Sequence, residues 1–198
     1  MVRRLIALGL LVTSCLSGEK FEAAPAPELC KIEPQYRFYD VHGSSPEEVR
    51  ASMVERGPKD VGGKARFAYT DWHISWRWRR TPTGNVDPNA ITLECTAEVL
   101  LPRWKPTSTA SVDFIRAWHR YVEHVREHEL KHVEHVSARA PEIIARLRRV
   151  SDERGAVSTT YANTLVNQIV NRIKALDRAY DRATNHGRTE GLWIVDPV

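Results

Sequence analysis

The segment between Ser111 and Pro141 carries an apolar stripe with the spacing of a long helix. Its large side chains follow one another three, four or seven residues apart: Phe114, Trp118, Tyr121, Val125, His132 and Val136. Residues at these spacings share one helix face, so the stripe predicts a helix packed on a core, which Pro141 should end or kink. A second stripe predicts another long helix over residues 158–183; its members are Leu165, Ile169, Ile173, Leu176 and Tyr180.

The segments before these helices have the patterns of strands and one short helix. Residues 36–41, 67–78 and 91–101 are rich in aromatic and β-branched side chains, and a helix should begin near Ser45 and end at about Arg56. Large apolar side chains occupy every second position of the middle segment: Trp72, Ile74, Trp76 and Trp78. We interpret this row as one buried face of an antiparallel hairpin rather than as a substrate platform. The order predicts an α+β fold with a small antiparallel sheet packed against two long helices.

The N-terminus has the features of an export signal. Arg3 and Arg4 precede an uncharged apolar run over residues 5–12, which is too short to span a bilayer. Small residues then lead to Cys15, a pattern that resembles a lipobox and predicts lipidation of this cysteine; the alternative is an ordinary signal peptide cut near Ala24 or Ala26. We therefore expect a signal peptide (1–15), a flexible tether (16–33) and a single folded domain (34–198). This predicts a periplasmic lipoprotein of the cell envelope or a secreted protein.

The remaining cysteines and the charge balance limit the possible partners. Of three cysteines, lipidation of Cys15 leaves Cys30 and Cys95, which in an exported protein predict a disulfide, with two unpaired thiols as the alternative. The net charge is +4, with acidic and basic residues interspersed and no basic tract interleaved with aromatics. We therefore expect no nucleic-acid binding.

The first long helix contains an HExxH motif formed by His128, Glu129 and His132. Two histidines four residues apart lie on one helix face and can hold one zinc ion, and the glutamate is then near enough to a water on the metal to take its proton. The alternative is a charged, solvated helix. Glu129, however, falls near the middle of the apolar stripe, where an ionised carboxylate is costly unless it is paired or serves a metal site.

Several further motifs, in order along the chain, accompany HExxH. They are Tyr39-Asp40-Val41-His42-Gly43, the strand from Thr70 to Trp76, Cys95, Leu101-Pro102-Arg103-Trp104, Trp118, and the segment Tyr180-Asp181-Arg182-Ala183-Thr184-Asn185-His186-Gly187. With them, residues 36–193 resemble the bacterial DUF922 family. The resemblance implies a secreted zinc-dependent protease with a zincin-like metallopeptidase architecture.

A catalytic zinc site needs a third protein ligand beside the two helix histidines. We rank His186 first, because it follows the second long helix in the family-like segment. Asp181 ranks second as a direct ligand, or else accepts a hydrogen bond from a ligand histidine. His135 ranks third, because a straight helix lifts it about 10 Å from His128. Tyr180 is expected to be a core residue with a satisfied hydroxyl or, less favoured, an oxyanion donor.

These residues together predict a zinc metallopeptidase. His128, His132 and His186 would hold Zn²⁺, and Glu129 would act as the general base in the hydrolysis of a peptide or protein substrate. The alternative from another class is a non-catalytic, zinc-binding envelope lipoprotein that uses the same histidines. A third possibility is that the helix binds no metal.

Overall fold

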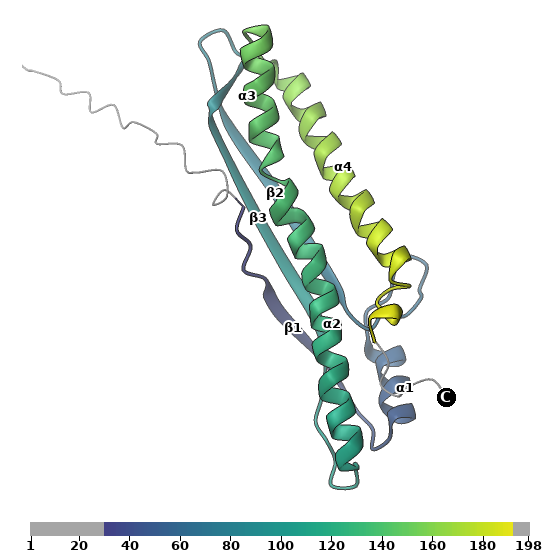
Figure 1. The fold of residues 1–198 in the computed structure, drawn as a ribbon. Coiled ribbons are helices and arrows are strands. Elements are labelled where there is room, and N and C mark those ends of the chain that lie inside the picture. Colours follow the sequence, from purple (N-terminus) through teal and green to yellow (C-terminus); the bar gives the residue numbers. More distant parts are fainter. Residues whose placement is uncertain (1–29, 192–198) are drawn as a thin grey trace, which may run out of the picture.

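The computed structural model describes residues 30–191 and has an α+β fold, as the sequence predicts (Figure 1). The elements in chain order are β1 (Gln35–Val41), α1 (Pro46–Arg56), β2 (Tyr69–Arg80), β3 (Val86–Trp104), α2 (Val112–Arg139), α3 (Glu142–Arg154), α4 (Thr159–Ala183) and the 3₁₀ helix η1 (Arg188–Glu190). The signal peptide, Cys15 and most of the expected tether lie outside the described residues. None of the helices between residues 30 and 191 combines the length with the hydropathy that a membrane span requires.

The sheet has three strands in the order β1-β3-β2 and is mixed rather than wholly antiparallel. The predicted hairpin is confirmed, since β2 pairs antiparallel with β3 and Trp72 lies opposite Ala97. β1, however, runs parallel to β3, with Gln35 opposite Glu98. The chain reverses once through α1 and again in the hairpin, so β3 recovers the direction of β1.

Serine caps begin the three helices for which the sequence predicted a start. Ser45, Ser111 and Ser158 each accept a hydrogen bond from the backbone N–H three residues further on, which satisfies one otherwise unpaired donor. The break at Pro141 is also confirmed, because α2 ends at Arg139. No element was predicted for the segment that follows, where α3 continues the column of α2 (Figure 1).

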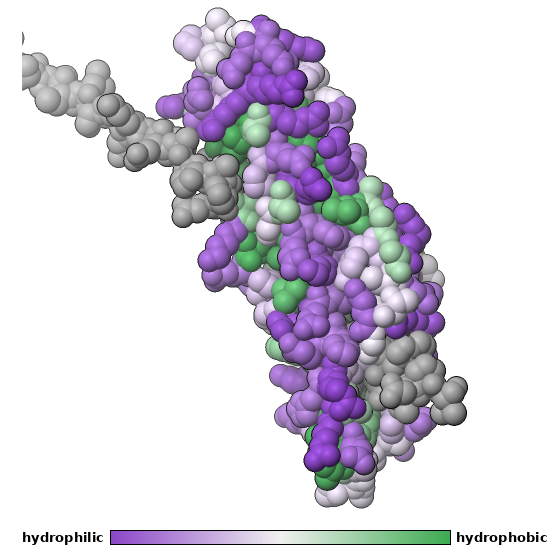
Figure 2. All heavy atoms as spheres, viewed as in Figure 1, coloured by the Kyte–Doolittle hydropathy of each residue, from purple (hydrophilic) through white to green (hydrophobic). Residues whose placement is uncertain are grey.

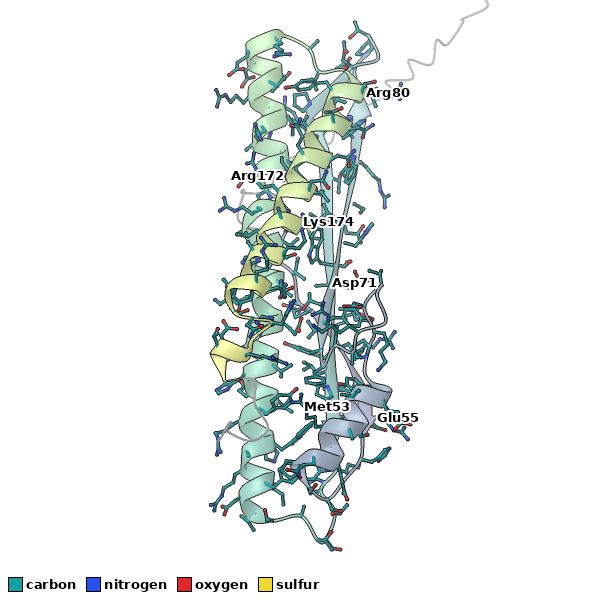
Figure 3. All side chains as sticks on the ribbon, turned by 90° about the vertical axis from the view of Figure 1, so that its right-hand side faces the viewer. Met53, Glu55, Asp71, Arg80, Arg172 and Lys174 are labelled. Atoms are coloured by element: carbon teal, nitrogen blue, oxygen red, sulfur yellow. A yellow bond between two sulfur atoms is a disulfide. The ribbon has the colours of Figure 1, made fainter. Side chains whose placement is uncertain are left out.

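Two apolar clusters form the core along the length of the molecule. One joins the hairpin to α3 and α4, and includes Ile74, with Trp72 packed against it. The other joins α1 and β1 to the first half of α2. Figure 3 shows Met53 on the side of α1 that faces α2, where its side chain is fully buried, and Glu55 on the opposite side.

The helices cover one face of the sheet, and α4 runs back along α3 and α2 (Figure 1). The outward faces of the helices are mostly hydrophilic (Figure 2). Cys30 and Cys95 form a disulfide with their Cα atoms 5.5 Å apart, which ties the segment before β1 to β3. The C-terminal end of α4 lies beside the middle of α2, where the HExxH motif is located (Figure 1).

Candidate metal centre

The α2 helix buries the HExxH side chains under α4 and the hairpin. His128, Glu129 and His132 are only 5%, 6% and 8% exposed, respectively. The helix phase inferred from the apolar stripe is therefore confirmed. A charged, solvated helix would leave these side chains in water, so that alternative is wrong for this turn.

Asp181 of α4 faces both histidines. Its Oδ1 atom lies 3.3 Å from Nε2 of His128 and 3.3 Å from Nε2 of His132. Zinc bonds of about 2.0–2.2 Å place two ligand atoms of a tetrahedral ion about 3.3–3.6 Å apart. Both nitrogen–oxygen separations match this spacing, and all three atoms lie within 4.8 Å of one another, so the three side chains could hold one ion.

A second carboxylate orients each of the two imidazoles from behind. Nδ1 of His128 lies 2.8 Å from Glu190 Oε2, and Nδ1 of His132 lies 3.1 Å from Asp177 Oδ1. Carboxylates that accept the Nδ1 hydrogen of a ligand histidine hold its Nε2 atom toward the metal and raise its basicity. Asp177 itself is held by the indole N–H of Trp72, 2.8 Å away.

Without a metal ion, both imidazoles should be protonated on both nitrogens. All four ring nitrogens face carboxylates, which only accept hydrogen bonds. Burial opposes the charged form of His132, but its bonds to Asp177 and Asp181 outweigh burial and raise its pKa to about 10. Burial also opposes the charged form of His128, and its bonds to Asp181 and Glu190 outweigh burial and raise its pKa. The carboxylates around the two imidazoles therefore stabilise positive charge between them, and zinc can supply that charge in place of the Nε2 protons.

The raised pKa of His132 predicts how the stability of the metal-free protein depends on pH. A proton held more tightly by the folded state stabilises the fold below the unfolded pKa of about 6.5, and this contribution disappears as pH rises through the folded pKa of about 10. For each pH unit by which the folded-state pKa exceeds the unfolded-state pKa, the free energy of unfolding rises by about 1.4 kcal/mol. For a chain of this size this corresponds to about 3–5 °C in Tm. In a chelator, Tm measured by circular dichroism should therefore fall between pH 6.5 and pH 10. With zinc, the gain in Tm should grow over the same range, and a flat profile in chelator would contradict the paired-charge interpretation.

The general-base candidate, Glu129, lies beside these candidate ligands at the wall of a cavity. Thr70 of β2 donates a hydrogen bond to its Oε2 atom at 2.8 Å. Burial raises the pKa of this carboxyl group above its ordinary value. The cavity has a volume of about 780 Å³, within the ~300–1,000 Å³ of typical ligand sites, and His128, His132 and Asp181 also line it.

The structure places Asp181, and not His186, beside the histidine pair. The helix ends at Ala183, and a left-handed turn at Asn185 and His186 (φ 49° and 54°) carries the His186 ring away. Its Nδ1 atom is 3.8 Å from Asp181 Oδ2 and accepts a hydrogen bond from Arg66 at 3.2 Å. The ranking of His186 above Asp181 therefore does not match this geometry, because a side chain within α4 points at α2 directly.

The other two residues weighed for the site have partners of their own. His135 binds Asp177 Oδ1 through Nδ1 at 2.7 Å, and so lies behind His132 rather than beside His128. The Tyr180 ring stacks on that of His128, with centroids 4.8 Å apart, and its hydroxyl donates to Glu190 at 2.8 Å. Tyr180 is thus a packed residue with a satisfied hydroxyl.

Sequence reasoning missed three contributors to the site. Asp177 carried a signal, because it precedes Asp181 by four residues and repeats the spacing of the two histidines. Thr70 and Glu190 carried none, since they approach from a strand and from the turn after α4.

Comparison with known proteins identifies one family. A model described as a bacterial protein of unknown function (DUF922) matches residues 36–187 of the chain. The match includes HExxH, Asp177, Asp181 and His186. No curated protein and no solved structure matches this sequence.

Proposed function

The chain belongs to the DUF922 family of bacterial proteins of unknown function, and we propose that it is a zinc-dependent hydrolase that cleaves peptide bonds. The observation that carries the proposal is that Asp181 Oδ1 lies 3.3 Å from both His128 Nε2 and His132 Nε2, beside the buried carboxyl group of Glu129. In this proposal those three side chains hold the metal, while Asp177 and Glu190 orient the imidazoles.

A bound zinc ion would supply Lewis acidity, polarising the scissile carbonyl and lowering the pKa of water. Glu129 takes a proton from the attacking water and passes it to the leaving amine. The Thr70 hydroxyl holds Oε2 of Glu129, so Oε1 is the oxygen assigned to this transfer. Burial raises the pKa of Glu129, which makes its carboxylate a stronger base toward the attacking water.

Metal analysis combined with a cleavage assay tests the proposal. We expect one zinc per chain in purified protein, cleavage of casein or of a peptide library, and loss of that cleavage in a chelator. Added zinc should restore it. Zinc without cleavage would favour the non-catalytic zinc-binding lipoprotein, and absence of bound zinc would overturn both functions.

We further propose that the protein acts outside the cytoplasm, as an envelope lipoprotein or a secreted enzyme. The disulfide between Cys30 and Cys95 supports an oxidising compartment. The leader and Cys15 motifs support export and a lipid anchor.

A further inference from the structure

Acidic and basic side chains of the cavity lining come from different parts of the fold. The carboxylates Glu129, Asp177 and Asp181 are on α2 and α4, around the histidines. Five basic side chains are on α1, on the α1–β2 loop and in the turn after α4: Arg50, Lys59, Lys64, Arg66 and Arg188. Among the described lining residues of those three segments, one is acidic, Asp60, and it is paired with Arg66 at 3.0 Å. The lining beside the candidate metal ligands therefore carries a net positive charge that favours an anionic ligand.

Arg66 is the most firmly held of these basic groups. Its Nη2 donates to Asp60 Oδ2 at 3.0 Å and its Nη1 donates to His186 Nδ1 at 3.2 Å, and its side chain is only 32% exposed. A guanidinium has five N–H donors in a planar fork, and these two bonds use two of them. Within residues 30–191 the other three N–H groups have no hydrogen-bond partner, so they can donate to a ligand in the cavity.

The loop that carries Arg66 is held in place by its own hydrogen bonds. Asp60 Oδ1 accepts from the backbone N–H groups of Gly62 and Lys64 at 3.0 and 2.9 Å. The backbone N–H of Arg66 donates to Pro58 O at 2.8 Å. The loop passes beside the C-terminal end of α4 (Figure 1), which brings Arg66 to His186. A fixed fork of donors loses little side-chain entropy when it binds an anion.

The neighbouring basic residues have different roles. Lys59 donates to Val54 O and so caps the end of α1. The Arg50 guanidinium lies over the Phe67 ring, 5.7 Å from its centroid. Arg50 and Lys64 thus add positive charge near Arg66. The side-chain hydrogen bonds to Asp60 and His186 belong to Arg66.

We propose that the substrate carries a carboxylate near the scissile bond and that Arg66 binds it. This inference rests on the proposed peptidase function and assigns its substrate class. Planar, bidentate recognition is the mode in which arginine binds carboxylates most specifically. The carboxylate is that of an aspartate or glutamate side chain, or of the chain terminus in a peptide cut near its C-terminal end.

Three peptides and two variants of the full-length zinc-loaded protein test the inference. The peptides contain an internal glutamate with an amidated end, a glutamine in its place with an amidated end, and that glutamine with a free carboxyl end. Wild type should cleave one or both carboxylate peptides about 10- to 100-fold faster, in kcat/KM, than the neutral peptide. Arg66→Gln should remove this preference, so that kcat/KM for the carboxylate peptides falls to about that for the neutral peptide. The matched control is Arg103→Gln, which breaks an Arg–Asp ion pair of 2.7 Å on the sheet, away from the cavity, and should retain the preference.

Peptide binding to zinc-loaded Glu129→Gln provides a second readout that does not depend on turnover. Fluorescence anisotropy should show that this variant binds the carboxylate peptides more tightly than the neutral peptide. The difference in affinity should disappear in the double variant that also carries Arg66→Gln. Should Arg66→Gln fail to fold, Arg66→Lys retains the charge without the fork and should lose part of the preference. Equal cleavage of all three peptides by wild type would overturn the inference and leave the peptidase function standing. If the protein binds zinc but cleaves none of the peptides, and binds all three equally, both the carboxylate inference and the peptidase function would be overturned.

Discussion

Replacement of Glu129 by glutamine is expected to lower kcat by about 10²- to 10⁴-fold while the protein still holds one zinc per chain. Glutamine keeps the shape of the side chain and an oxygen that can accept the hydrogen bond from Thr70. It lacks the basic oxygen that takes a proton from water. Because no contact to His128, His132 or Asp181 changes, metal content should be unaffected. The measurement is single-turnover cleavage of a fluorogenic peptide alongside zinc analysis of the same sample.

The matched control for this variant is Glu127→Gln. Glu127 lies on the same helix two residues earlier, but its side chain is exposed. It should change neither kcat nor zinc content. Full activity of Glu129→Gln would remove Glu129 from the mechanism, and loss of zinc would mean that Glu129 acts through the metal site.

Replacement of Asp181 by alanine is expected to weaken zinc binding by more than about 100-fold. Loss of a carboxylate that only orients a ligand histidine costs about 10- to 100-fold, and loss of a ligand should cost more. Asp181 Oδ1 is the one carboxylate oxygen among the described residues that faces both Nε2 atoms, at 3.3 Å from each. Competition against a chromogenic chelator measures the affinity, and peptide cleavage should disappear with the metal.

His186→Ala is the comparison that decides between the two ligand assignments. Its ring is 46% exposed and its Nδ1 atom binds Arg66, so we expect zinc affinity to change by less than about 10-fold, below the loss expected for a ligand. A larger loss from His186→Ala than from Asp181→Ala would restore the histidine as the third ligand. Circular dichroism of both variants separates loss of a ligand from loss of folding.

Local patterns were sufficient to predict most of the secondary structure. Ser111 and Ser158 begin their helices because a capping hydroxyl acts within three residues. The alternation of Trp72 and Ile74 marks the buried face of β2 because strand side chains point to opposite faces in turn. The direction of β1 was not predicted, because it depends on how the chain returns through α1 and not on any pattern within the strand.

The site was predictable only as far as it lies on one helix. His128, Glu129 and His132 are placed relative to one another by the helix repeat alone. The choice between Asp181 and His186 depends on where α4 stops and on the left-handed turn that follows. Glu190 reaches His128 only because that turn folds back over α2.

The amino-acid sequence by itself determined the α+β class, the helix that presents two imidazoles on one face, and the burial of Glu129 within its apolar stripe. These follow from side-chain spacing over one or two turns, where covalent geometry sets the distances. The tertiary structure alone decided that Asp181 faces the imidazoles, that Asp177 and Glu190 lie behind them, and that Arg66 lines the cavity beside His186. Those contacts join residues 45 to 120 positions apart, and only the packing of α4 and the α1–β2 loop against α2 brings them together.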